Sequence, residues 1–182
     1  ITQALEKAAR ERLLYRDVRP NAPAAAVTMA VLPTPSLGET ARMTDVQVDP
    51  HIISLADTKS PIAEQYRILK MNLQTQGGQA KTFVVTSALR GEGKSVTSLN
   101  LAATLARDER LKVVLVDADL RKSSVNKWLG LAESAEGLSN ALQNGGALNG
   151  TLIRLASPAL TILPAGPAPD DPASLLESAN MR

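Results

Sequence analysis

The stretch that most constrains the fold is a glycine-containing loop between an apolar, β-prone run and an amphipathic helix. Residues 82–87 (TFVVTS) predict a buried strand, and residues 94–107 (KSVTSLNLAATLAR) predict a helix. Between them, residues 88–95 read Ala-x4-Gly-Lys-Ser, the pattern of a phosphate-binding loop with alanine in place of the usual leading glycine. Strands alternate with helices along the chain, which predicts an α/β protein with a mostly parallel sheet flanked by helices.

Each residue type in this loop has a physical reason to be there. Gly91 and Gly93 permit backbone angles that turn successive N–H groups toward phosphate oxygens. The first turn of the following helix directs its positive end to the same place. Lys94 supplies a mobile charge for the outer phosphates, and the Ser95 hydroxyl can ligate Mg²⁺. We therefore predict a nucleotide site; the alternative is a turn with an incidental lysine, which the strand–loop–helix context disfavours.

Two aspartates follow the next predicted buried strand, residues 111–117. Asp117 and Asp119 stand at its carboxyl end, the edge that faces the ligand crevice in open α/β sheets. They could bind Mg²⁺ directly or through water, and one could accept a proton. Arg121 could contact phosphate or pair with these aspartates. The alternative is a solvated turn with a helix N-cap, which is less attractive beside a phosphate loop.

The chain divides into three predicted parts. Residues 1–17 predict a short helix, either exposed or docked on a partner. Residues 18–51 hold five prolines among Ala, Thr and Ser and predict a linker. Residues 52–182 form the predicted phosphate-loop domain. Its other expected elements are a helix from Pro61 to Gly77, short helices near 124–129 and 137–143, a strand at 160–164 and the start of a last helix. In the first of these helices, an apolar face is expected from Ile62, Tyr66, Leu69 and Leu73.

Composition excludes several kinds of site. The chain has no Cys, so it cannot form a disulfide, a thiolate metal site or a cysteine nucleophile. His51 is the single histidine and cannot build a zinc site alone. A net charge of +2 gives no case for a nucleic-acid partner. No apolar run approaches the roughly 20 residues of a membrane span, and no signal peptide is visible. We therefore expect a cytoplasmic protein without a transmembrane segment of its own.

Together these motifs resemble the bacterial tyrosine kinase family, the autokinases of capsule and exopolysaccharide synthesis. Three segments are similar to family motifs: TSALRGEGKSVTSLNLA at 86–102, VLVDADLR at 114–121 and LPAGPAPDDPASLLES at 163–178. Glu64, Arg67 and Lys70 match the family's upstream E-x2-R-x2-R helix motif, with Lys at the last position. The opening ITQALEKAA is similar to the start of the subgroup associated with exosortase loci. The resemblance implies the P-loop NTPase fold of the MinD/ParA-like branch.

The resemblance implies transfer of the γ-phosphoryl group of ATP, with Mg²⁺, to tyrosines in a neighbouring subunit's C-terminal tail. Lys94 would hold the phosphates and Ser95 would bind Mg²⁺. Asp117 and Asp119 would orient the metal or activate the tyrosine hydroxyl, and which does which stays open. The implied nucleotide contacts are Ala88, Arg90, Gly91, Glu92, Gly93, Lys94, Ser95, Val96 and Arg121.

Implied partners follow from the same resemblance. Glu64, Arg67 and Lys70 would pair with a neighbouring subunit and close a homo-oligomeric ring; the alternative is an ordinary i, i+3 ion pair on the helix surface. A separate membrane chain-length regulator would bring the protein to the inner face of the membrane.

Two family elements are expected beyond the last residue, Arg182: a third apolar strand ending in a metal-binding Asp, and the C-terminal tyrosine cluster. Because the chain also begins with Ile1, we expect a fragment whose domain is incomplete at its C-terminus and inactive alone. Two other functions stay open. One is a MinD/ParA-type ATPase switch, whose motif has a lysine where this chain has Leu89. The other is a non-catalytic, ATP-binding regulator of a polysaccharide export complex.

Overall fold

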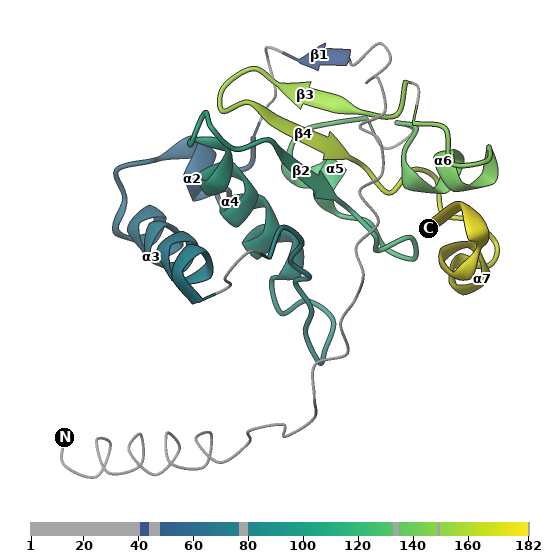
Figure 1. Ribbon diagram of the computed structural model, residues 1–182, viewed down its shortest axis with the longest axis horizontal. Helices are drawn as coiled ribbons and strands as arrows, with labels where there is room; N and C mark the ends of the chain where they lie inside the picture. Colours follow the sequence, from purple (N-terminus) through teal and green to yellow (C-terminus); the bar gives the residue numbers. More distant parts are fainter. Residues whose placement is uncertain (1–40, 44–47, 77–79, 133–134, 149, 182) are drawn as a thin grey trace, which may run out of the picture. The chain divides into compact units, whose positions relative to one another are not determined.

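A small four-stranded sheet, in the order β1–β3–β4–β2, forms the centre of the computed structural model (Figure 1). The strands are β1 (Ala41–Met43), β2 (Val113–Val116), β3 (Ile153–Leu155) and β4 (Leu160–Leu163). β1 pairs with β3 and β2 with β4 in parallel, whereas β3 and β4 are antiparallel. Two of the three pairings are therefore parallel, and the predicted α/β class with a mostly parallel sheet is confirmed.

The structure describes residues 41–43, 48–76, 80–132, 135–148 and 150–181. The helix predicted at 1–17 and most of the linker predicted at 18–51 lie outside the described residues. Strand β1 and residues 48–51 fall within the predicted linker stretch but belong to the described fold. The Asp49 N–H donates to the Trp128 carbonyl at 2.9 Å, and Val48 packs against the core.

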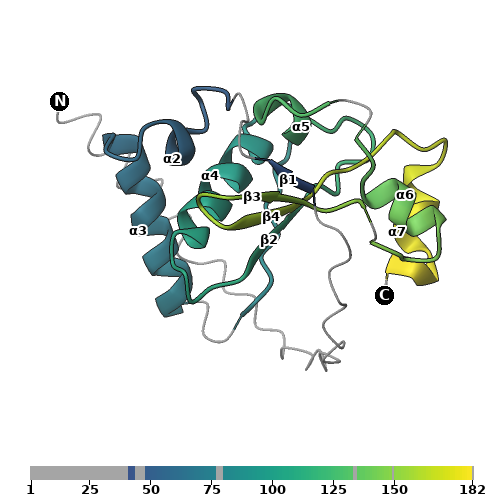
Figure 2. The ribbon, with the colours of Figure 1, turned by 90° about the horizontal axis from the view of Figure 1, so that it is seen from above.

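The helices agree closely with the sequence pattern. They are α2 (Ile53–Ala56), α3 (Pro61–Gln76), α4 (Lys94–Ala106), α5 (Val125–Trp128), α6 (Leu138–Gln143) and α7 (Pro172–Glu177), followed by the 3₁₀ turn η1 (Ala179–Met181). Only α2 and η1 were not expected from the sequence. In Figure 2, α3 and α4 lie together on one side of the sheet, and α6 and α7 lie together near the opposite end.

Helix α4 lies at the centre of the main hydrophobic core. Its Leu99, Ala102 and Ala106 are buried, and they share one cluster with Leu160 and Ile162 of β4. A second cluster joins α6 to the end of β4. A helix buried over most of its length has little freedom to tilt, so the core fixes the position of its N-terminus.

The strand predicted at 82–87 does not form, and this prediction was wrong. These residues have no regular structure, and the side chains of Phe83 and Val84 are 40% and 84% exposed. Strand β4 already has β2 on one side and β3 on the other, and the run does not pair with the outer edge of β2, which is the last strand of the described sheet. The apolar, β-branched run has the propensity for a strand but does not specify a partner.

The apolar face predicted for α3 is also partly wrong. Ile62 is 55% exposed, while its neighbour Ala63 is 3% exposed. Tyr66 is half-buried. The inner side of α3 also carries Arg67 and Lys70, which bond to groups outside the helix, so the buried stripe is rotated away from Ile62.

Candidate nucleotide-binding site

The loop before α4 has the backbone geometry that a phosphate site requires. Gly91 and Gly93 have φ angles of +81° and +89°, in the region that residues with a side chain rarely adopt. A Cβ added to either glycine would meet nothing within 4 Å, so open space surrounds both positions. Gly93 is the N-cap of α4, which leaves the N–H groups of the first helical turn without intrahelical acceptors. The loop can therefore offer backbone donors to an anion.

Hydrogen bonds within the loop hold its shape. The Ser87 hydroxyl donates to the Leu89 carbonyl at 2.9 Å, and the Leu89 N–H donates to the Glu92 carboxylate at 3.0 Å. Glu92, a predicted nucleotide contact, is therefore used inside the loop in this structure.

The other predicted nucleotide contacts differ in exposure. Ala88, Arg90, Gly91 and Arg121 are exposed, whereas Gly93, Lys94, Ser95 and Val96 are half-buried. Within the described part of the chain, Lys94 forms no salt bridge. Its ammonium group is thus not neutralised by a described carboxylate and is available to an anionic ligand.

Asp117 is a buried carboxylate directly after β2. The residue is 7% exposed, and its N–H extends the sheet pairing by donating to Leu163 O at 3.0 Å. Oδ1 accepts from the Asp119 N–H at 3.1 Å, and Oδ2 accepts from the Ser123 hydroxyl at 2.8 Å and the Val125 N–H at 3.4 Å. No salt bridge neutralises this carboxylate among the residues that the structure describes.

Asp119, the second predicted acid, lies in a different environment. It is exposed, and its Oδ1 accepts from the Lys122 N–H at 3.1 Å. The two aspartates that the sequence pattern treats alike are therefore distinguished by burial.

Two residues that the sequence did not single out connect the phosphate loop to Asp117. The Ser124 hydroxyl donates to Ser95 Oγ at 2.8 Å, and the preceding Ser123 bonds to Asp117. The structure thus brings the predicted metal-binding groups of Ser95 and Asp117 to either side of one serine pair. Consecutive serines before a short predicted helix indicate a helix cap, so no sequence pattern pointed to this contact.

The donors gathered here suit a hard divalent cation. Ser95 and Asp117 offer a hydroxyl and a carboxylate, the oxygen ligands that Mg²⁺ prefers. The Asp117 carboxylate accepts three hydrogen bonds but has no cationic partner among the described residues, so its negative charge can still attract a cation. The residues present therefore fit Mg²⁺, with Ser95 and Asp117 as the side chains that would hold it.

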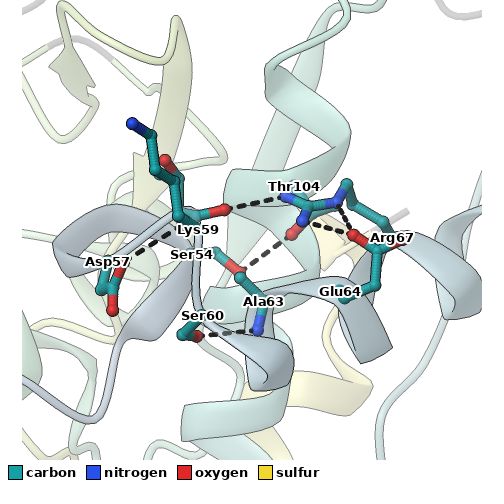
Figure 3. Close-up of polar contacts among 9 residues, drawn as sticks. Ser54, Asp57, Lys59, Ser60, Ala63, Glu64, Arg67 and Thr104 are labelled. Atoms are coloured by element: carbon teal, nitrogen blue, oxygen red, sulfur yellow. Dashed lines mark hydrogen bonds and ion pairs between the residues drawn. The ribbon is translucent and has the colours of Figure 1, made fainter.

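The predicted oligomerisation residues lie on α3 and make contacts within the chain. Arg67 forms an ion pair with Glu64 (Figure 3). Its Nη1 also donates to the Thr58 carbonyl at 2.9 Å. Lys70 Nζ lies 3.8 Å from Asp108 Oδ2. The i, i+3 ion pair that the sequence left open as an alternative is thus present between Glu64 and Arg67.

Comparison with known proteins gives a family model over the core of the domain. Residues 83–156 match the CobQ/CobB/MinD/ParA nucleotide binding domain, CbiA. The match includes the loop before α4, Asp117 and the Ser123–Ser124 pair. Within the described ranges, no helix has the length and apolar character to cross a membrane.

Individual relatives are named as tyrosine kinases. The chain is 37% identical over 134 residues to tyrosine-protein kinase YwqD of Bacillus subtilis (strain 168), covering 72% of this chain and 56% of that protein. It is 34% identical over 116 residues to tyrosine-protein kinase CpsD of Streptococcus agalactiae, covering 64% of this chain and 50% of that protein. The chain thus spans about half the length of these two relatives.

A solved structure shows the same fold. The crystal structure of the chimerical protein CapA2B2 superposes with a TM-score of 0.66 at 29% identity, covering 80% of this chain and 62% of that chain.

Proposed function

Because this chain belongs to the bacterial tyrosine kinase family, we propose that the protein containing it is an ATP-dependent protein-tyrosine autokinase. It transfers the γ-phosphoryl group to tyrosines in a neighbouring subunit's C-terminal tail and regulates exopolysaccharide or capsule synthesis and export. The observation that carries the proposal is the link between the phosphate loop and the buried Asp117 through Ser123 and Ser124. This link unites both predicted halves of the site.

In this proposal the loop and the first turn of α4 bind the phosphates. Gly91 and Gly93 let backbone N–H groups point at phosphate oxygens, and Lys94 neutralises the charge of the outer phosphates. When bound by Ser95 and Asp117, Mg²⁺ supplies further neutralisation of the β- and γ-phosphates. Positioning and charge neutralisation account for most of the catalysis in phosphoryl transfer.

The two aspartates take different roles because their surroundings differ. Asp117 is buried and both of its oxygens are held by hydrogen bonds, which gives it the fixed geometry of a metal ligand. Asp119 is exposed, so an incoming tyrosine hydroxyl can reach it and give up its proton. Arg121 is also exposed, and in this proposal it would contact phosphate or the aspartates.

The proposal extends to partners. A homo-oligomeric ring would use Glu64, Arg67 and Lys70, and Glu64 has the most exposed side chain of the three, at 54%. Arg67 and Lys70 would have to share or exchange their present partners within the chain. A membrane chain-length regulator would hold the protein at the inner, cytoplasmic face of the membrane, as the family resemblance implies.

Phosphotyrosine formation by the full-length protein tests the proposal. After incubation with Mg·ATP, phosphotyrosine is measured by mass spectrometry in the wild type, Lys94→Met and the control Lys112→Met, which removes an exposed lysine before β2. We expect the wild type and Lys112→Met to be phosphorylated and Lys94→Met to show none. Undiminished phosphotyrosine in Lys94→Met contradicts the proposal. Nucleotide hydrolysis without phosphotyrosine would instead favour an ATPase switch, and nucleotide binding without either reaction a non-catalytic regulator.

A further inference from the structure

We propose that Ser124 is a positioning residue that orients the Ser95 hydroxyl for Mg²⁺-dependent nucleotide binding, while Ser123 does the same for Asp117. This inference rests on the proposed function, because it concerns the same site. It assigns a role to two residues that lie outside the phosphate loop and outside the Asp-x-Asp motif.

The first observation is that Ser124 stands at a helix cap without acting as one. It is the N-cap residue of α5, where a serine side chain usually accepts a hydrogen bond from a backbone N–H of the first turn. No such cap bond forms here. The hydroxyl instead donates to Ser95 Oγ, 29 residues earlier in the chain, at 2.8 Å. The Ser124 hydroxyl therefore bonds to the phosphate-loop motif rather than to its own helix.

The second observation is the state of the Ser95 hydroxyl. A serine oxygen has two lone pairs, and the bond from Ser124 uses one of them. Because no other described residue bonds to the Ser95 hydroxyl, the second lone pair is open to a cation. Because the bond also restricts rotation about the Ser95 side chain, the free lone pair has a fixed direction before any ligand arrives. Pre-orientation of this kind lowers the entropy that binding must overcome.

The third observation is that the neighbouring serine serves the other candidate ligand. Ser123 donates to Asp117 Oδ2 at 2.8 Å, and the Val125 N–H adds a contact of 3.4 Å to the same oxygen. Consecutive residues thus hold the hydroxyl of Ser95 on α4 and the carboxylate after β2. A shift of this dipeptide would move both groups together, so it couples the two halves of the site.

The test separates Mg²⁺-dependent binding from binding of nucleotide alone. For the full-length protein, ATP affinity is measured by calorimetry across a Mg²⁺ series and in EDTA. We expect Ser124→Ala to raise the Mg²⁺ concentration that gives half-maximal enhancement of affinity about 3- to 10-fold, the size of one lost hydrogen bond. Affinity in EDTA should stay within about twofold of the wild type. Ser124→Thr, which keeps a hydroxyl, should restore the wild-type Mg²⁺ dependence.

A double-mutant cycle shows whether Ser124 acts through Ser95. If it does, Ser124→Ala should have no further effect on Mg²⁺ dependence in a Ser95→Ala background. Ser98→Ala is the matched control, because the Ser98 hydroxyl bonds only to Lys94 O within α4 among the described residues and should leave the Mg²⁺ dependence unchanged. Ser124→Cys keeps nearly the same volume with a weak donor. Ser124→Cys should raise the Mg²⁺ requirement for ATP binding as Ser124→Ala does. It therefore replaces the alanine variant in the test if that variant does not fold.

The outcomes distinguish this inference from the proposed function. A wild-type protein that binds no ATP at any Mg²⁺ concentration overturns the proposed function. If the wild type binds ATP in a Mg²⁺-dependent way and Ser124→Ala needs no more Mg²⁺ than the wild type for half-maximal enhancement of affinity, the inference alone is overturned. Additive effects of Ser95→Ala and Ser124→Ala also overturn it, because independent effects mean that Ser124 does not act through Ser95.

Discussion

Lys70 on α3 lies 3.8 Å, Nζ to Oδ2, from Asp108 in the turn that follows α4. Asp108 is also held by Arg110, whose Nε and Nη2 donate to the two carboxylate oxygens at 2.9 and 3.0 Å. The hydrogen bond from Arg110 is the main reason that the pKa of Asp108 is lowered to about 2. One carboxylate thus connects the C-terminal end of α4 to both neighbouring cations.

This lowered pKa predicts a pH-dependent contribution to stability. The ordinary pKa of the group is 3.8, and the folded-state value is about 2, so the unfolded chain takes up the proton first as the pH falls. The stabilisation is therefore complete above the ordinary pKa and is lost as the pH falls through the folded-state value. We expect the Tm difference between wild type and Asp108→Asn, measured by circular dichroism, to be largest at about pH 6 and to be mostly lost by about pH 2.

Glu109→Gln is the matched control for this prediction. It removes one negative charge from the next, exposed residue and should lower the Tm little at any pH. A Tm difference for Asp108→Asn that persists unchanged at the acid end would show that the carboxylate charge is not responsible.

Replacement of Gly93 by alanine should separate backbone strain from nucleotide binding. Gly93 and Gly145 have φ angles of +89° and +75°, and a Cβ at either position would meet nothing within 4 Å. Each Gly→Ala change should therefore lower the free energy of unfolding by a similar amount, about 1–2 kcal/mol. Of the two variants, only Gly93→Ala should also weaken ATP binding, by about tenfold or more, because Gly93 lies in the phosphate loop and Gly145 does not. Urea unfolding and calorimetry measure the two effects, and equal ATP affinity of both variants would contradict the assignment of the loop.

Asn100 should be a strong determinant of stability. The residue is 1% exposed; Oδ1 accepts from the Ser54 N–H at 2.8 Å, and Nδ2 donates to His51 O at 3.1 Å. Asn100→Ala leaves the Ser54 N–H buried without an acceptor, which should lower the free energy of unfolding by about 1–3 kcal/mol. Ser98→Ala, on the same helix, should change it by less than about 0.5 kcal/mol. Urea denaturation would contradict the prediction if the two variants were equally stable.

The helices could be predicted from the sequence because their signals are local. Pro61 after Ser60 starts α3, and the Ser60 hydroxyl accepts from the Ala63 N–H at 3.1 Å. The Gly93–Lys94 junction likewise starts α4. The strands depend on partners that are distant in sequence. The three-residue strands β1 and β3 have no periodic signal, and the run at 82–87 has strand propensity but pairs with no strand of the described sheet.

The candidate site residues stay predictions, and they differ in how directly the sequence points to them. Lys94, Ser95 and Asp117 could be proposed because the residue types in their motifs indicate the chemistry directly. The contribution of Ser124 could not be found, because a hydrogen bond between residues on α4 and α5 depends on tertiary packing. The sequence also could not predict that Asp117 is buried and Asp119 exposed, because both residues follow the same strand.

Helix α4 has one end in the phosphate loop and the rest of its length in the main core, with Leu99, Ala102 and Ala106 buried against the sheet. A ligand that binds only the folded loop should therefore protect the core from melting. At a concentration of 100 times its Kd, such a ligand adds about 2.7 kcal/mol to the free energy of unfolding. A thermal-shift screen of nucleotides would consequently identify the preferred ligand without any assay of phosphoryl transfer.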